Sequence, residues 1–129
     1  MDITKYLNRP WISGEADCWA LVRDIYRQEL GIELPVIDID ATDPRAVLRA
    51  FANPDNMRIW HPVDKPRHLD LIFLASRSRP SHVAVYLNIN GGYYLHSYCG
   101  AGSVCESVFD QDISGFGSPS YYRHISRMS

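Results

Sequence analysis

Apolar positions in the first third of the chain recur with the spacing of an α-helix. Over residues 17–31 they fall at i, i+3, i+4 and i+7, at Cys18, Leu21, Val22 and Ile25. Asp17 precedes this stripe as a helix N-cap, and Gly31 follows it as a stop. A second helix is predicted over residues 44–52, which begin with a proline. Because the thiol of Cys18 lies on the apolar stripe, it is predicted to face the core.

Beyond residue 68 the pattern changes to short runs of β-branched and aromatic residues separated by turn residues. Asn90-Gly91 is a strong hairpin signal between two of these runs. Residues 60–62 are predicted to be a loop between the helical and sheet regions. Helices followed by antiparallel strands indicate an α+β fold, with N-terminal helices packed on a central antiparallel sheet. Five strands are predicted, over residues 69–76, 82–88, 92–98, 103–109 and 120–126.

The composition is that of an ordinary globular protein, with 46% hydrophobic and 22% charged residues among 129. This length fits a single domain over residues 1–129. The formal net charge of −2 and the scattered basic residues argue against nucleic-acid binding. No apolar run approaches the roughly 20 residues that span a bilayer, and the N-terminus lacks the pattern of a signal peptide. We therefore expect a protein that is made in the cytoplasm, without membrane insertion.

Cys18 is predicted to lie at the start of a helix, where unsatisfied N–H groups and the macrodipole favour an anion. This position predicts a lowered thiol pKa and hence a reactive thiolate. His82 begins a predicted strand, and His96 lies in the next strand across the hairpin, so the two imidazoles are expected to be neighbours. A cysteine with a histidine base and a third polar group is typical of nucleophilic catalysis. In that arrangement His82 is the base and His96 orients it.

Two other interpretations of these residues remain open at this stage. A small cysteine on an apolar helix face is more often core packing, and histidines at strand starts are often structural. His96, Cys99 and Cys105, with His82 as a fourth ligand, form a candidate zinc site. Structural zinc sites favour Cys-x-x-Cys pairs, which this sequence lacks. The odd number of cysteines predicts at least one free thiol.

The segments "DCWALVRDIY", "HVAVYL" and "YYLHS" resemble, in this order, the motifs of the NlpC/p60 papain-like cysteine peptidases. The resemblance covers residues 11 to 98, approximately, and implies the papain-like fold with neither a cofactor nor a metal. It implies Cys18 as nucleophile and oxyanion donor, His82 as general base and acid, and His96 as the orienting third member. It also implies three candidate substrate-binding residues: Trp11, with Tyr6 as the alternative aromatic, and Asp17.

The reaction that this resemblance implies is hydrolysis of an amide bond in the stem peptides of peptidoglycan. The form "DCW-x-LVR-x-x-Y", followed by "ELGIELP", is especially similar to the branch found in bacteriophage tails and prophages. Other tail proteins are therefore expected partners, and a phage or phage-like tail is the expected location. The alternatives are a structural tail component that retains the fold, and an amidase or acyltransferase. Leu69 departs from the family's Gly-Asp-Leu strand motif, whereas Asp70 matches its acidic residue.

Overall fold

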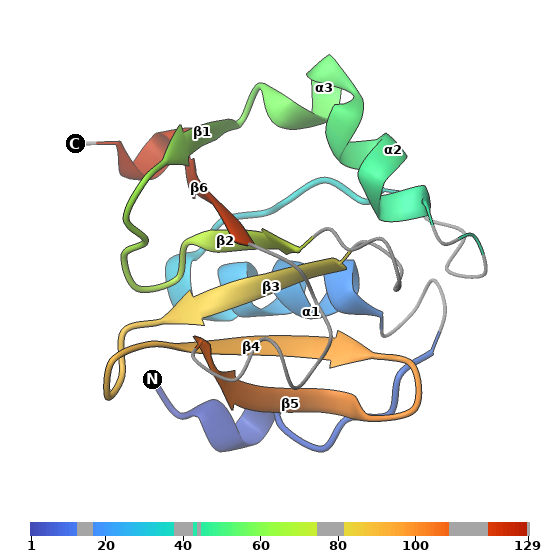
Figure 1. Cartoon of the computed structure of the whole chain (residues 1–129), viewed down its shortest axis with the longest axis vertical. Helices are drawn as coiled ribbons and strands as arrows, with labels where there is room; N and C mark the ends of the chain where they lie inside the picture. Colours follow the sequence, from blue (N-terminus) through green and yellow to red (C-terminus); the bar gives the residue numbers. More distant parts are fainter. Residues whose placement is uncertain (13–16, 38–42, 44, 75–81, 109–118, 129) are drawn as a thin grey trace.

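The computed structural model describes residues 1–12, 17–37, 43, 45–74, 82–108 and 119–128. In these residues, short helices pack on a six-stranded antiparallel sheet with the strand order β1-β6-β2-β3-β4-β5 (Figure 1). The predicted α+β class, with helices packed on an antiparallel sheet, is confirmed. The strands are β1 (Trp60–Val63), β2 (Leu71–Leu74), β3 (His82–Leu87), β4 (Tyr93–Tyr98), β5 (Gly102–Ser107) and β6 (Pro119–His124).

Helix α1 (Cys18–Ile25) begins where the sequence predicts, because Asp17 caps it. The Asp17 carboxylate accepts a hydrogen bond from the backbone N–H of Ala20 at 3.0 Å. The last turn continues as η2 (Tyr26–Leu30), a π-helical turn, and Gly31 ends it with a left-handed φ of 66°. The other helices are η1 (Ile3–Tyr6), α2 (Ala46–Ala52), α3 (Pro54–Met57) and η4 (Ile125–Arg127). The predicted second helix therefore corresponds to α2, and α3 was not predicted.

The hairpin between β3 and β4 is confirmed in detail. Asn90 and Gly91 have φ values of 47° and 89°, and the N–H of Gly92 donates to the carbonyl of Ile89 at 2.9 Å. These two residues are the centre of a turn with positive φ at both positions, inside the five-residue connection 88–92 between the paired Leu87 and Tyr93. This connection fixes the register in which Tyr86 of β3 pairs with Tyr94 of β4. The two predicted histidines are thereby brought to the same end of the sheet.

The prediction that residues 60–62 form a loop is wrong, because they belong to β1. Trp60 pairs with His124 of β6, and the strand lies at the edge of the sheet. Proline at residue 62 fits an edge strand but weakens the strand pattern in the sequence. The pairing partner lies about 60 residues away, so no local signal reveals it. The strands predicted over 69–76 and 103–109 extend into residues 75–76 and 109, which lie outside the described part of the chain.

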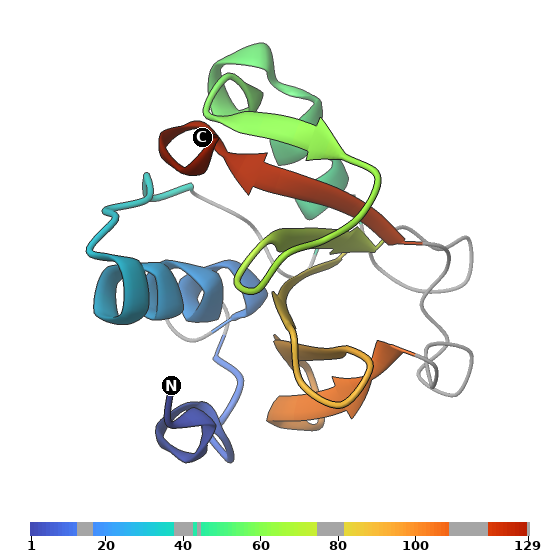
Figure 2. The ribbon, with the colours of Figure 1, turned by 90° about the vertical axis from the view of Figure 1, so that its left-hand side faces the viewer.

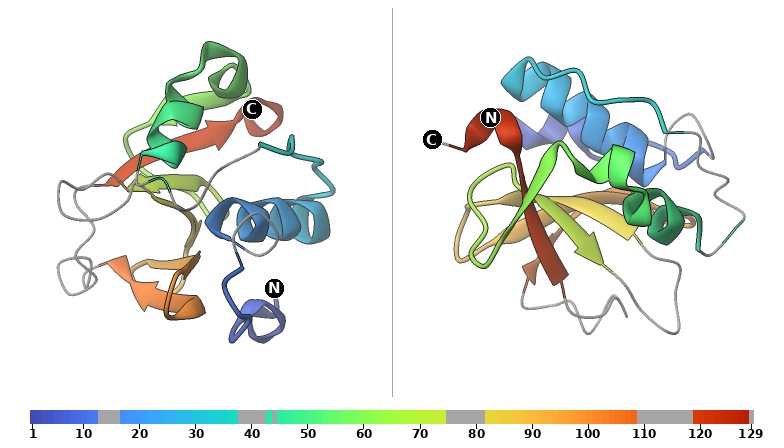
Figure 3. Two further views of the ribbon diagram at one scale, coloured as in Figure 1. Left: turned by 90° about the vertical axis from the view of Figure 1, so that its right-hand side faces the viewer. Right: turned by 90° about the horizontal axis from the view of Figure 1, so that it is seen from above.

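The two faces of the sheet bury different residues. Helix α1 lies along one face, against β3 and β4 (Figures 2 and 3). There Leu21, Val22 and Ile25 of α1 meet apolar side chains that the strands direct toward the helix: Leu71, Val83, Val85, Leu87 and Leu95. The opposite face carries a smaller cluster of Ile72, Leu74, Ala84 and Tyr94. The apolar stripe of α1 is buried against the sheet, as predicted, and this packing sets the position of the start of α1 relative to β3.

Asp70, directly before β2, joins β2 to the C-terminal end of the chain. Its fully buried carboxylate accepts two hydrogen bonds from Arg123 of β6, at 3.1 and 2.7 Å. Arg127 of η4 donates to the same carboxylate at 3.3 Å, and the N–H of Arg67 donates at 2.7 Å. Asp70, the acidic residue that matches the family's strand motif, therefore forms a buried ion pair with Arg123 of β6.

Candidate active site

Cys18 is the first residue of α1, and the residue is 7% exposed. The thiol sulfur accepts hydrogen bonds from backbone N–H groups, among them that of Val83, the residue after His82. The N–H groups of Cys18 and Trp19 also interact with the sulfur. The helix start and the start of β3 therefore meet at this thiol. The prediction that Cys18 lies at the first turn of a helix and faces the interior is confirmed.

The prediction of a lowered thiol pKa is wrong. Burial raises the pKa of Cys18 to about 12 and outweighs the opposite effect of the backbone N–H groups of Val83 and Trp19. The carboxylate of Asp17 raises it further. Cys18 is therefore a neutral thiol at physiological pH, and forming its thiolate requires a base that takes the proton.

His82 and His96 form a hydrogen-bonded pair, as the sequence predicts. The Nε2 atom of His82 lies 2.7 Å from Nδ1 of His96, and both residues are buried. Burial, and then the neighbouring His96, lower the pKa of His82 well below 6.5. Burial lowers the pKa of His96 to about 4, against the smaller effects of Glu106. Both imidazoles are thus neutral at pH 7. Since His82 uses Nε2 toward His96, Nδ1 is its second nitrogen for proton exchange.

Aromatic side chains from β4 fix the orientation of the His96 ring. Tyr98 stacks on His96 with a centroid distance of 5.0 Å and an interplanar angle of 25°, and Tyr94 lies at 4.6 Å. These three residues alternate along β4 and share one face of the strand. Tyr98 also contacts the ring of His82 edge-on at 6.3 Å. The histidine pair is therefore held between aromatic rings, which restricts its rotation.

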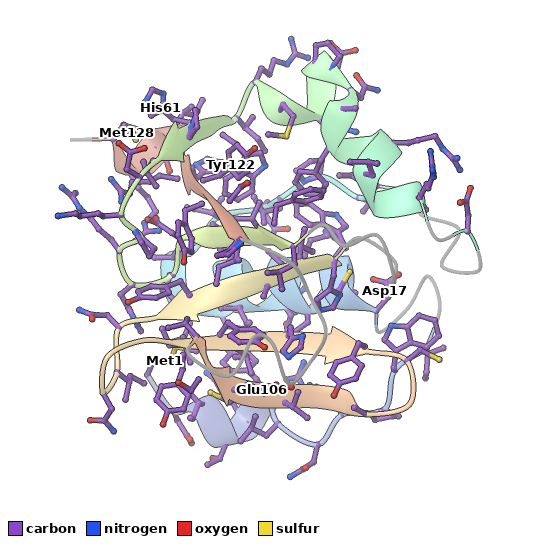
Figure 4. All side chains as sticks on the ribbon, viewed as in Figure 1. Met1, Asp17, His61, Glu106, Tyr122 and Met128 are labelled. Carbon is purple, nitrogen blue, oxygen red and sulfur yellow. The ribbon has the colours of Figure 1, made fainter. Side chains whose placement is uncertain are left out.

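Glu106 of β5 is a residue of this site that the sequence did not single out. Its carboxylate Oε1 lies 3.2 Å from Nε2 of His96. Figure 4 labels Glu106 on β5 and Asp17 at the start of α1. The contact depends on the register in which β5 pairs with β4, with Glu106 opposite Tyr94. The sequence predicts that Glu106 lies on a strand, but it contains no signal for the register between β4 and β5.

The three predicted substrate-binding residues have different environments. Asp17 lines a pocket of about 270 Å³ together with Arg9, Arg23 and Ser97, among others. The half-buried Trp11 lines a second pocket of about 460 Å³, next to the turn between β4 and β5. Asp17 and Trp11 are thus both accessible from pockets, and Arg9 lines both.

Tyr6, the alternative aromatic residue, is fully buried in the core. Its hydroxyl donates to Glu29 at 2.6 Å. Burial of the ring and use of its hydroxyl within the core argue against a contact with substrate. We therefore retain Trp11 and no longer consider Tyr6 a candidate for substrate binding.

The zinc interpretation finds no support in the described part of the chain. Cys105 pairs with Leu95 and packs against the α1-side core, whereas His96 pairs with Val104, so alternation sends the two side chains to opposite faces. Cys99 is exposed in the turn after β4. Within the described residues, no three His, Cys, Asp or Glu side chains gather as metal ligands do. All three cysteines are free thiols, in line with the expectation of at least one.

Comparison with known proteins identifies the family of the chain. A model of the NlpC/P60 family matches residues 7–116, a span that contains Cys18, His82 and His96. The chain belongs to the NlpC/P60 family. Its fold is similar to the crystal structure of the NlpC/p60 domain of the peptidoglycan hydrolase SagA, with a TM-score of 0.57 and 21% sequence identity over 92% of this chain and 90% of that one. No curated protein matches the sequence. The predicted NlpC/p60 papain-like fold is thus confirmed.

The departure from the NlpC/p60 pattern at Leu69 has a structural meaning. Leu69 has a φ of 72°, a left-handed conformation that glycine adopts without strain. Its side chain is nevertheless buried in the core, and its carbonyl accepts a hydrogen bond from the hydroxyl of Tyr26. Burial of the leucine side chain therefore offsets the strain of its backbone.

No helix in the described residues is long and apolar enough to span a membrane.

The raised pKa of Cys18 makes its reactivity dependent on pH. In a Cys99→Ala/Cys105→Ala/His82→Ala background, in which His82 cannot assist, alkylation of Cys18 by iodoacetamide is expected to accelerate about tenfold per pH unit between pH 7 and 10, because only the thiolate reacts. The measurement is the alkylation rate followed by intact-protein mass spectrometry. A rate that is already constant between pH 6 and 8 would mean that the thiolate is preformed.

Proposed function

We propose that this protein is a cysteine endopeptidase that hydrolyses an amide bond in the stem peptides of peptidoglycan. The observation that carries the proposal is the contact of the Cys18 thiol, at the start of α1, with the backbone N–H of Val83, directly after His82, whose ring is hydrogen-bonded to the buried His96 of β4. Membership in the NlpC/P60 family supports a hydrolase, and the structurally similar SagA domain is that of a peptidoglycan hydrolase. A phage tail as its location is supported by the sequence pattern around Cys18 alone.

The proposed reaction begins with a proton transfer. His82 takes the thiol proton at Nδ1 as the sulfur attacks the scissile carbonyl, so that no free thiolate is needed beforehand. The N–H groups at the start of α1, which face the sulfur, are placed to donate to the developing oxyanion. His82 then returns the proton to the leaving amine as the tetrahedral species collapses to a thioester. Water, deprotonated by His82, hydrolyses the thioester and restores the thiol.

His96 keeps His82 in position during these steps. Its hydrogen bond to Nε2 of His82 and the stacking of Tyr98 hold both rings. When His82 becomes an imidazolium, His96 accepts the hydrogen bond from its Nε2–H and stabilises the cation. Asp17, directly before Cys18 in the chain, and Trp11, which lines the other pocket, are the proposed contacts for the peptide.

The test is digestion of purified peptidoglycan and of soluble stem peptides by the wild-type protein and by Cys18→Ala. Mass spectrometry of the products is expected to find one new amine and one new carboxyl group, formed only with the wild-type protein. Release of intact stem peptides from the glycan, or transfer to an added amine, would identify an amidase or an acyltransferase instead. Complete absence of cleavage by folded protein, across several wall chemistries, would favour a structural tail component.

A further inference from the structure

Glu106 extends the histidine pair by one residue. Its Oε1 atom lies 3.2 Å from Nε2 of His96, while Nδ1 of the same ring is bonded to His82. The second carboxylate oxygen, Oε2, accepts a hydrogen bond from the hydroxyl of Tyr94 at 3.3 Å. Only 23% of the Glu106 side chain is exposed. The carboxylate is therefore held on both oxygens, with one of them directed at His96.

We propose that Glu106 is a positioning residue that sets the tautomers of both imidazoles. A carboxylate has only acceptor oxygens, so Nε2 of His96 carries the hydrogen in its bond to Glu106. In a neutral His96 the lone pair is then on Nδ1, which accepts from Nε2–H of His82. His82 consequently has its own lone pair on Nδ1. This is the tautomer that can take a proton from Cys18.

The reverse arrangement disables the base. If Nδ1 of His96 carried the hydrogen, it would donate to Nε2 of His82, and the proton of His82 would move to Nδ1. His82 would then have no lone pair to offer the thiol. A buried imidazole N–H without an acceptor is costly, so the group at Nε2 of His96 decides between the two arrangements. Glu106 selects the one in which His82 can act.

Among the described residues that contact the His96 ring, Glu106 is the one with a charged side chain. The titratable groups around the ring are His82 from β3, Tyr94 and Tyr98 from β4, and Glu106 from β5. The tyrosine hydroxyls can both donate and accept, so they impose no single tautomer. Among these groups, the carboxylate of Glu106 accepts without being able to donate, so it forces the hydrogen onto Nε2.

The catalytic consequence rests on the proposed function, whereas the tautomers are observable without it. The experiment compares wild type, Glu106→Gln and Glu106→Leu by long-range ¹H–¹⁵N NMR of the histidine rings and by the rate of stem-peptide hydrolysis. Wild type is expected to carry hydrogen on Nε2 of both His82 and His96. Leucine is expected to shift both rings toward the Nδ1–H form and to lower kcat about 10- to 100-fold. Glutamine, whose amide can donate or accept, is expected to give mixed tautomers and an intermediate rate.

The outcomes separate this inference from the proposed function. Glu33→Gln, which removes an exposed carboxylate far from β5 in the sequence, is the matched control and is expected to change neither readout. Unchanged ring tautomers in Glu106→Leu would overturn the inference, even if activity fell. A wild-type protein with the expected tautomers but no hydrolysis of any substrate would leave the role of Glu106 intact and refute the peptidase.

Discussion

Replacement of His82 by alanine is expected to lower kcat for stem-peptide hydrolysis by about 10⁴- to 10⁶-fold. With a pKa of about 12, roughly one Cys18 thiol in 10⁵ is ionised at pH 7, so attack without a base is slow by a comparable factor. The leaving amine also loses its proton donor. The backbone N–H groups at the start of α1 remain and account for the residual rate. Initial rates on a purified stem peptide measure the effect.

His61, a histidine outside the site, serves as the matched control for this prediction. His61 is exposed on β1, at the opposite edge of the sheet from β5, and His61→Ala is expected to keep the wild-type rate. His82→Gln, which preserves more of the buried volume, tests whether a folding defect explains the loss, and thermal unfolding of each variant is measured alongside. Partial recovery of His82→Ala by added imidazole would support a missing base. A His82→Ala rate within tenfold of wild type would refute the role assigned to His82.

Replacement of Asp70 by asparagine is expected to lower the free energy of unfolding by about 3–5 kcal/mol. The carboxylate and Arg123 are both buried, so the neutral amide leaves a guanidinium without its counter-charge in the core. Arg127 loses the same partner. This loss is large against the total of about 5–15 kcal/mol that is typical of a domain. Urea unfolding followed by circular dichroism measures it.

An exposed ion pair provides the control for Asp70. Asp55 lies 4.0 Å from Arg58, and both side chains are largely exposed, so Asp55→Asn is expected to change stability by less than about 0.5 kcal/mol. An equally small effect of Asp70→Asn would show that the buried pair does not stabilise the junction between β2 and β6. At a temperature where Asp70→Asn is still folded, it is expected to retain hydrolysis, because within the described residues the Asp70 carboxylate bonds to Arg67, Arg123 and Arg127 and to neither Cys18 nor the histidine pair.

The sequence predicted those parts of the site that depend on local pattern. The N-cap of α1, its apolar stripe and the Asn90-Gly91 hairpin are local signals, and together they place Cys18, His82 and His96 at one end of the sheet. Glu106 required the pairing of β4 with β5, which no single strand specifies. The pKa of Cys18 was mispredicted for a related reason. The helix terminus is visible in the sequence, whereas the burial that outweighs it arises only from packing.

The central claim is that the thiol of Cys18 performs the attack. It is tested most directly by alkylating the wild-type protein at about pH 9 and measuring, in the same samples, the remaining hydrolysis and the fraction of each cysteine modified. We predict that activity falls in direct proportion to alkylation of Cys18, and that modification of the exposed Cys99 alone leaves the rate unchanged. Wild-type hydrolysis by protein in which Cys18 is fully alkylated would contradict the account.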